Sequence, residues 1–162
     1  NISSHEMSGQ YDYILSIGML EHILDYDDLF QKAASCLKPG GKALFHAIYN
    51  YSRFDKTDTF LSKYVFSGSK VPNFQQTMHT LKKYFKHIKE RSLPDLSYAK
   101  TLDCWYSAFC KEEKNIRHLL KTRGKCKDVD YAIRIFKHYL VMCSIGHAIT
   151  NYMHYVVLSG EK

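Results

Sequence analysis

The chain has 162 residues, of which 45% are hydrophobic and 24% are charged. This length and composition are typical of one folded core and exclude a disordered or collagen-like chain. The formal net charge is +7 and the pI is about 9.1, with basic residues spread over many segments. Such a diffuse positive field favours anionic partners, either nucleic acid or an acidic lipid surface, but an ordinary solvated surface explains it equally well.

Five cysteines, an odd number with no Cys-x-x-Cys spacing, argue against a disulfide framework and against a zinc cluster, and we expect no metal. The longest apolar stretch, around 139–149, is interrupted by polar residues and is too short to span a bilayer. The chain starts at Asn1 without an initiator methionine, a signal core or an arginine-rich presequence, which indicates a cut front.

The first 50 residues predict a strand, a helix and a second strand. Residues 11–18 are apolar, β-branched and aromatic and stop at a glycine, which predicts a strand buried on both faces. Residues 24–37 have helical spacing, Lys38-Pro39-Gly40-Gly41 predicts a turn, and 42–48 predict the next strand. This βαβ unit requires a parallel pair and a right-handed crossover.

The pattern changes after this unit. Residues 49–76 predict an irregular segment with a short helical turn that covers the strand ends. Beyond it we expect a short helix over 77–84, a strand over 87–92, one long helix over 98–122 closed by Gly124, a helix over 129–147 and a strand over 152–158. No repeat or linker interrupts the chain, so we expect one α/β domain that is incomplete at its front.

Two short segments lie at the C-terminal ends of the predicted strands, where an open α/β sheet binds its ligand. They are Gly18-Met19-Leu20-Glu21-His22 and His46-Ala47-Ile48. A carboxylate directly after a buried strand is costly unless it has a partner or a task, so Glu21 is the first candidate for chemistry.

These segments match, in order, motifs of the cyclopropane fatty acid synthases and their relatives, which include plant alkaloid N-methyltransferases. Lys63-Tyr64-Val65-Phe66-Ser67-Gly68 with Val71-Pro72, and Tyr98-x-x-Thr101-Leu102-x-x-Trp105, resemble two further motifs of the family. The resemblance implies the C-terminal part of a Rossmann-like class I methyltransferase, with a mostly parallel sheet and a helical acceptor-side cap. Residues 1–162 would then be the C-terminal portion of one methyltransferase domain, without its glycine-rich cofactor-binding N-terminal half.

The resemblance also implies an enzyme that transfers a methyl group from S-adenosylmethionine to the double bond of an unsaturated phospholipid acyl chain, forming a cyclopropane. An alkene carbon attacks the methyl group, and bicarbonate takes a proton from the resulting carbocation before the ring closes. The family pattern assigns catalytic roles to Glu21, His22, His46, Ile48 through its backbone, and Tyr98 through its hydroxyl. It assigns cofactor contacts to Asn1, Ile2, Ile17 and Gly18, although many relatives carry aspartate where this chain has Asn1.

Other interpretations stay open at this point. Glu21 and His46 can be satisfied structural residues, and Ile17 and Gly18 can serve ordinary strand packing. In an amine N-methyltransferase of the same fold, which Ser67-Gly68 slightly favours, Glu21 and His22 would deprotonate the substrate. A third candidate is an inactive truncated relative that acts as a structural or assembly subunit.

The expected partners follow from these alternatives. They are a phospholipid or small-amine substrate, a peripheral membrane contact and a second copy or a larger assembly, with no nucleic acid, in a cytoplasmic or membrane-peripheral location.

Overall fold

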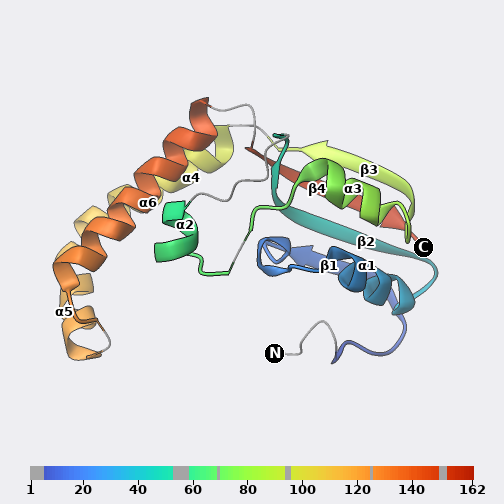
Figure 1. Cartoon of the computed structure of the whole chain (residues 1–162), viewed down its shortest axis with the longest axis horizontal. Helices are drawn as coiled ribbons and strands as arrows, with labels where there is room; N and C mark the ends of the chain where they lie inside the picture. The colour runs from blue at the N-terminus through green and yellow to red at the C-terminus, as the bar shows by residue number, and fades with distance from the viewer. Residues whose placement is uncertain (1–5, 53–58, 69, 94–95, 125, 150–152) are drawn as a thin grey trace. The chain divides into compact units, whose positions relative to one another are not determined.

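The computed structural model describes residues 6–52, 59–68, 70–93, 96–124, 126–149 and 153–162 (Figure 1). The chain forms two compact units. The sheet unit consists of Asn1–Thr57, Gly68–Leu93 and Asn151–Lys162, and the helical unit consists of Asp58–Ser67 and Pro94–Thr150. That the whole chain belongs to one methyltransferase domain stays a prediction.

The sheet unit contains four strands in the order β1-β2-β4-β3. They are β1 (Tyr11–Ile17), β2 (Leu37–Asn50), β3 (Lys86–Ser92) and β4 (Met153–Glu161). β1 and β2 are parallel, which confirms the predicted βαβ unit. The pairs β2–β4 and β3–β4 are antiparallel, so the sheet within this chain is mixed.

The predicted Pro-Gly turn lies inside β2. Tyr11 is opposite Leu37, whereas Tyr13 is opposite Lys42, so the register shifts over Lys38–Gly41. Such extra residues form a bulge that bends the strand. Gly40 has a φ of +72°, a conformation that only glycine adopts without strain.

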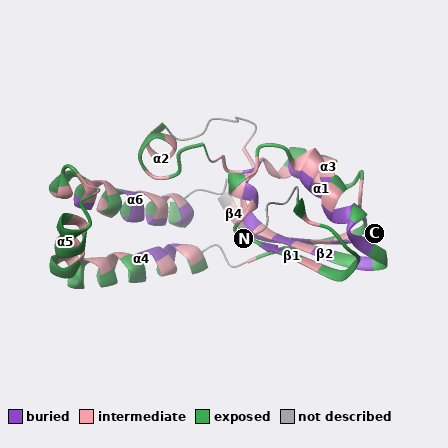
Figure 2. Ribbon diagram, turned by 90° about the horizontal axis from the view of Figure 1, so that it is seen from below, coloured by how far each residue is buried: buried purple, intermediate pink, exposed green. Residues whose placement is uncertain are grey.

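Two helices cover the same face of the sheet (Figure 2). α1 (Tyr26–Ser35) begins at Asp25, whose carboxylate accepts the Asp28 N–H at 3.0 Å, and α3 (Phe74–Leu81) begins at Asn73. Both aspartate and asparagine are preferred N-caps because their side chains satisfy a free N–H. The core between helices and sheet contains Leu20, Leu29, Phe30, Ala33, Leu37, Phe45, Ala47, Tyr49, Leu81, Phe85, Val156 and Leu158.

The prediction that β1 is buried on both faces is wrong for the face opposite α1 and α3. β1 was expected to be buried on both faces, but Tyr13, Leu15 and Ile17 are 76%, 65% and 64% exposed. β1 is the edge strand of the described sheet, and these alternate residues point away from α1 and α3. An apolar run shows that a strand suits burial, but it does not show that the covering element lies in the same 162 residues.

The helical unit contains α2 (Thr59–Tyr64), α4 (Leu96–Lys111), α5 (Glu113–Thr122) and α6 (Val129–Ile149). α4 and α6 pack together around Leu102, Tyr139 and Leu140. The Ser144 hydroxyl on α6 donates to Asp103 Oδ1 at 2.6 Å and so links the two helices.

The single long helix predicted over 98–122 is wrong, because the chain turns at Glu112 between α4 and α5. After this turn Glu113 forms ion pairs with Arg117 at 2.8 Å and with Lys137 of α6 at 2.6 Å. Gly124, with a φ of +62°, follows the end of α5 as predicted.

Candidate functional site

The candidate site begins where β1 ends. Gly18 has a φ of +59°, and its N–H donates to the His46 carbonyl at 2.9 Å as the last bond of the β1–β2 ladder. The chain then forms the short helix η2 (Leu20–His22), which is anchored by the fully buried Leu20. This reversal directs Glu21 back toward β2.

The Glu21 side chain replaces the next backbone hydrogen-bond acceptor beside β2. Its Oε1 accepts the backbone N–H of Ile48 at 2.8 Å, a donor that would face a backbone carbonyl if β1 continued. The Glu21 carbonyl accepts the N–H of Lys70 at 2.9 Å. The residue is therefore held through both its side chain and its backbone.

The second carboxylate oxygen differs from the first. Glu21 Oε2 is buried and has no hydrogen-bond partner among the described residues. A buried acceptor of this kind is costly unless a donor reaches it, because the protein has removed it from water. Glu21 thus carries one oxygen engaged in structure and one that suits a ligand donor.

The other predicted residues of the sheet unit lie close to this position in the fold. Ile48 holds Glu21 directly, and His46 is half-buried on β2, opposite Ile17 in the register. His22 is exposed, one residue after Glu21. The structure thus brings Glu21 and Ile48 into contact and places His46 on β2, two residues before Ile48.

The predicted cofactor-side residues are only partly described. Ile17 is exposed at the end of β1, and a side chain added at Gly18 would meet open space. This strand end therefore leaves room for a flat ligand. Asn1 and Ile2 lie outside the described residues.

Tyr98 belongs to α4 in the helical unit. Its half-buried ring packs edge-on against His147 of α6, with ring centroids 4.8 Å apart, and against Trp105 at 6.3 Å. The aromatic neighbours fix the ring, so the direction of its hydroxyl is set by packing between α4 and α6.

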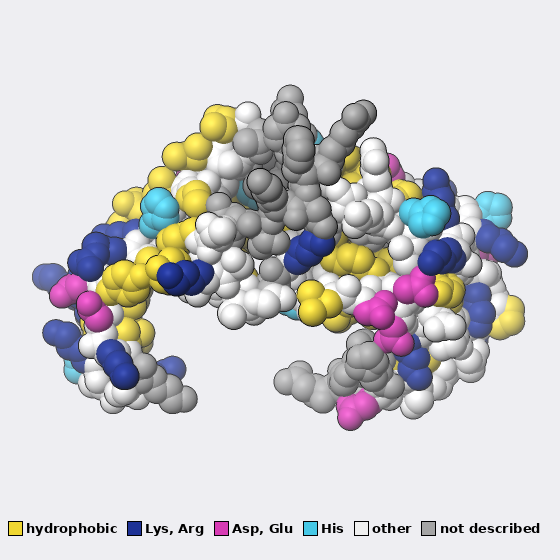
Figure 3. Space-filling view, viewed as in Figure 1, with side chains coloured by type: hydrophobic (Ala, Val, Ile, Leu, Met, Phe, Trp, Pro, Cys, Tyr) yellow, Lys and Arg dark blue, Asp and Glu magenta, His cyan; other side chains and the backbone are white. Residues whose placement is uncertain are grey.

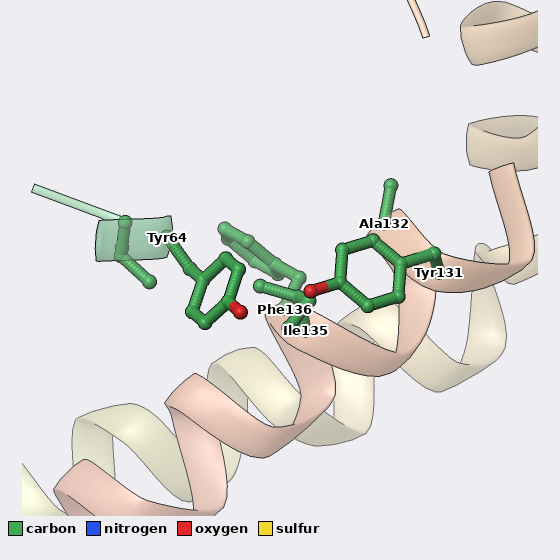
Figure 4. A pocket seen from close by; sticks show the side chains of 6 residues that line it. Tyr64, Tyr131, Ala132, Ile135 and Phe136 are labelled. Carbon is green, nitrogen blue, oxygen red and sulfur yellow. The ribbon is translucent and has the colours of Figure 1, made fainter. Parts of the chain in front are cut away.

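The helical unit also contains an apolar cavity of about 370 Å³ (Figure 4). Its lining comes from α2, the residue that follows α2, and α6: Tyr64, Val65, Tyr131, Ala132, Ile135 and Phe136. A hydrogen bond with Tyr131 and the neighbouring Lys63 lower the pKa of Tyr64.

Sequence reasoning missed the buried polar residues behind the site. Ser16 of β1 and Tyr49 of β2 are 7% and 0% exposed, and neither hydroxyl has a hydrogen-bond partner in the described part of the chain. The alternation of Ala43, Phe45, Ala47 and Tyr49 was the signal that β2 continues to Tyr49 with its ring in the core.

Two expectations concern the molecule as a whole. Within the described ranges, no group of histidine, cysteine and acidic residues is placed to hold a metal ion, and no helix is long and apolar enough to cross a membrane. Lys and Arg side chains are scattered over the face shown in Figure 3 rather than gathered in one patch.

The comparison with known proteins assigns the family. The profile of the mycolic acid cyclopropane synthetases matches residues 2–155. The chain belongs to this family. It is 28% identical over 141 residues to the cyclopropane-fatty-acyl-phospholipid synthase of Escherichia coli K12, and the match covers 86% of this chain and 35% of that protein.

A second relative is also similar to this chain. The tuberculostearic acid methyltransferase UfaA1 of Mycobacterium tuberculosis is 25% identical over 122 residues, which cover 70% of this chain and 28% of that protein. The chain thus spans about a third of the length of the curated relatives that it matches.

Solved structures show the same fold. The cyclopropane synthase MmaA2 of Mycobacterium tuberculosis superposes with a TM-score of 0.85 at 22% identity, covering 99% of this chain and 58% of the other. A coclaurine N-methyltransferase superposes with a TM-score of 0.74 at 20% identity, covering 98% and 50%. The fold is therefore that of the class I methyltransferases, as the sequence predicted.

Proposed function

We propose that this chain is the acceptor-side and proton-handling part of an S-adenosylmethionine-dependent methyltransferase whose acceptor is the double bond of an unsaturated phospholipid acyl chain. The observation that carries the proposal is the Glu21 carboxylate, held at the strand end by Ile48 with Oε2 buried and without a described partner. Family membership and the named acceptor of the Escherichia coli relative support the choice of lipid.

The residues at the end of β1 fit the methyl donor. Ile17 presents an exposed apolar surface and Gly18 leaves open space above the backbone, so this strand end can hold one side of S-adenosylmethionine. When bound, this cofactor supplies an electrophilic methyl group. The adenine contacts that the family pattern assigns to Asn1 and Ile2 fall outside the described residues and stay a prediction.

The proton-handling residues fit bicarbonate in one orientation. Two anions repel, so Glu21 tolerates bicarbonate only when Oε2 accepts the hydroxyl proton of that ion. The Ile48 N–H already donates to Oε1, so Ile48 orients Glu21 rather than the ion. His46, also on β2, would hold the ion from the same unit, and bicarbonate would supply a base for the proton that leaves the substrate before ring closure. The contact that the family pattern assigns to the Tyr98 hydroxyl stays a prediction.

An acceptor assay tests this proposal. The intact protein is given S-adenosylmethionine with a labelled methyl group and vesicles of monounsaturated phospholipid, with fully saturated phospholipid as the matched control. We expect label only in the unsaturated lipid, whose acyl chain gains one CH₂. Absence of label in both lipids rejects the proposal that a lipid is the acceptor.

Amine N-methylation is the second candidate. Its support is that His22 is exposed beside Glu21, so that both residues can meet an ammonium group. In addition, this chain has Ser67-Gly68 where the family motif of the bacterial cyclopropane synthases ends in Pro-Gly. Label in small amines and none in lipid would establish it. If the intact protein binds no S-adenosylmethionine in calorimetry, both enzyme proposals fail and the assembly-subunit interpretation replaces them.

A further inference from the structure

Tyr49 is the largest polar residue buried behind the candidate site. It follows Ile48 on β2, its side chain is 0% exposed, and its ring packs edge-on against Phe74 of α3 with centroids 5.8 Å apart. In the described part of the chain its hydroxyl has no hydrogen-bond partner. A buried phenol normally finds a partner, so this hydroxyl requires an explanation.

The unpartnered oxygen of Glu21 supplies that explanation. Ile48, the neighbour of Tyr49, donates its N–H to Oε1, so the Glu21 carboxylate lies beside this end of β2. Burial and, next, the charge of Glu21 raise the pKa of Tyr49, with smaller contributions from Tyr26 on α1 and Tyr51 after β2. The phenol therefore stays protonated and lies within electrostatic reach of the carboxylate.

We propose that Tyr49 is a positioning residue for Glu21, its hydroxyl donating to Oε2 through one ordered water molecule. A single water satisfies both buried groups, because it accepts from the phenol and donates to the carboxylate. A carboxylate oxygen accepts two hydrogen bonds, so Oε2 keeps one acceptor site for a ligand. The inference rests on the proposed function for its catalytic consequence, but not for the hydrogen bonds themselves.

The consequence is a carboxylate fixed at both oxygens. Ile48 holds Oε1 from the strand, and Tyr49 holds Oε2 from the core. The ligand-facing lone pair of Oε2 then has one direction, which is what proton transfer at a defined position requires.

Tyr49→Phe in the intact protein tests the proposal, because it removes only the hydroxyl and keeps the ring against Phe74. At fixed pH, we expect the carboxyl ¹³C resonance of Glu21, assigned by its loss in Glu21→Gln, to move. For methyl transfer we expect kcat to fall by about tenfold or more, with KM for S-adenosylmethionine changed by less than about twofold, as for a misplaced catalytic group.

Tyr51→Phe is the matched control. Its hydroxyl donates to Glu90 Oε1 at 2.9 Å, on the far strand β3, so its removal should leave the Glu21 resonance in place. An unmoved Glu21 resonance in folded Tyr49→Phe overturns the proposal, whether or not the protein transfers methyl groups. A moved resonance without any methyl transfer supports the positioning role and rejects the proposed function instead.

A second variant covers the case in which Tyr49→Phe fails to fold. Fluorotyrosine introduced at position 49 keeps both the ring and the hydroxyl but makes the hydroxyl a stronger donor. The Glu21 resonance should then differ from that of the parent protein. Its shift should be opposite in direction to the shift caused by loss of the hydroxyl. An identical resonance in the two folded proteins overturns the proposal.

Discussion

The Glu21 carboxylate has two separable tasks, one for each oxygen. Oε1 accepts the Ile48 N–H, which an amide oxygen can do equally well. We therefore expect Glu21→Gln in the intact protein to fold with a free energy of unfolding within about 1 kcal/mol of the parent. Methyl transfer should fall by at least about 100-fold, because the charge that handles the proton is gone.

Initial rates with labelled S-adenosylmethionine, read beside denaturant unfolding curves, measure both effects. Asp12→Asn is the matched control, since this exposed carboxylate pairs with Lys38 on the surface at 2.9 Å. More than half of the parent rate in Glu21→Gln would show that Glu21 is structural only.

Gly160 on β4 offers a stability test that is independent of function. A Cβ added there would lie 2.7 Å from the Cβ of Phe85, closer than side chains tolerate. Replacing glycine by alanine within a strand normally stabilises by about 0.5–1 kcal/mol, but the overlap costs about 1–3 kcal/mol. We expect the overlap to win, so that Gly160→Ala lowers the free energy of unfolding.

Urea unfolding compares Gly160→Ala with Ser159→Ala, the adjacent strand position on the other face, which should be nearly neutral. A Gly160→Ala protein as stable as the parent would mean that β4 and Phe85 move apart at little cost.

At the scale of residues, the sequence indicated which side chains to consider but not the contacts that hold them. Glu21 and His46 were selected as candidates because an open α/β sheet binds ligands at its strand ends, a rule that needs only the order of the elements. Glu21 does follow β1, whereas His46 lies within β2. The Glu21–Ile48 hydrogen bond could not be predicted, because it depends on the register of β1 against β2 and on the shift over Lys38–Gly41. The contact of Gly160 with Phe85 also joins residues far apart in the chain.

Among the elements, β1, β3, β4 and α6 were predicted close to their observed bounds. β2 begins at Leu37, before the predicted turn, and α4 and α5 were not separated. Phe109 and Ile116 lie two helical turns apart on either side of Glu112, so helical spacing alone favours one helix. The turn is instead accompanied by the ion pair between Glu113 and Lys137, which joins α5 to α6. An ion pair between segments far apart in the chain cannot be predicted from the spacing of apolar residues.

The ion pairs of Glu113 predict a pH dependence of the helical unit. Hydrogen bonds with Lys137 and Arg117 lower the pKa of Glu113 from its ordinary value of 4.5. A carboxylate whose pKa is lowered by folding stabilises the fold above its ordinary pKa, and this contribution is lost as the pH falls through the lower, folded value. The ion pairs are solvent-accessible, so the effect should be small.

Thermal melts of the parent and of Glu113→Gln at pH 7 and at pH 3 measure this contribution. We expect the parent to melt at the higher temperature at pH 7 and the two midpoints to converge at pH 3. Added salt should also narrow the gap at pH 7. A gap that is unchanged between the two pH values would show that packing of α5, and not its charge, sets the difference.

At the scale of the whole chain, the fold class was predictable, while the exposure of β1 was not. Composition and the βαβ pattern are enough for an α/β sheet with helices on one face. They do not reveal which strand lies at the edge of the described sheet. The exposed side chains of Tyr13, Leu15 and Ile17 form one contiguous apolar stripe on that strand, named here the β1 face.

The β1 face leads to a prediction about association. An exposed apolar stripe on a strand with an unpaired edge tends to bind a second chain. We expect residues 1–162, produced on their own, to self-associate in sedimentation velocity as their concentration rises. Leu15→Lys should shift the distribution toward monomer, because it places a charge in the middle of the stripe. Gln10→Lys adds the same charge outside the stripe and should leave association unchanged.

The same substitution distinguishes a solvent-exposed β1 face from a covered one. In the 162-residue chain Leu15 is 65% exposed, so a lysine there loses little packing and should leave the free energy of unfolding nearly unchanged. In a longer polypeptide that covers this stripe, Leu15→Lys would bury an unpaired charge, and unfolding curves should show a loss of several kcal/mol. Parent and Leu15→Lys proteins with identical association in the short form would mean that the β1 face makes no contacts between chains.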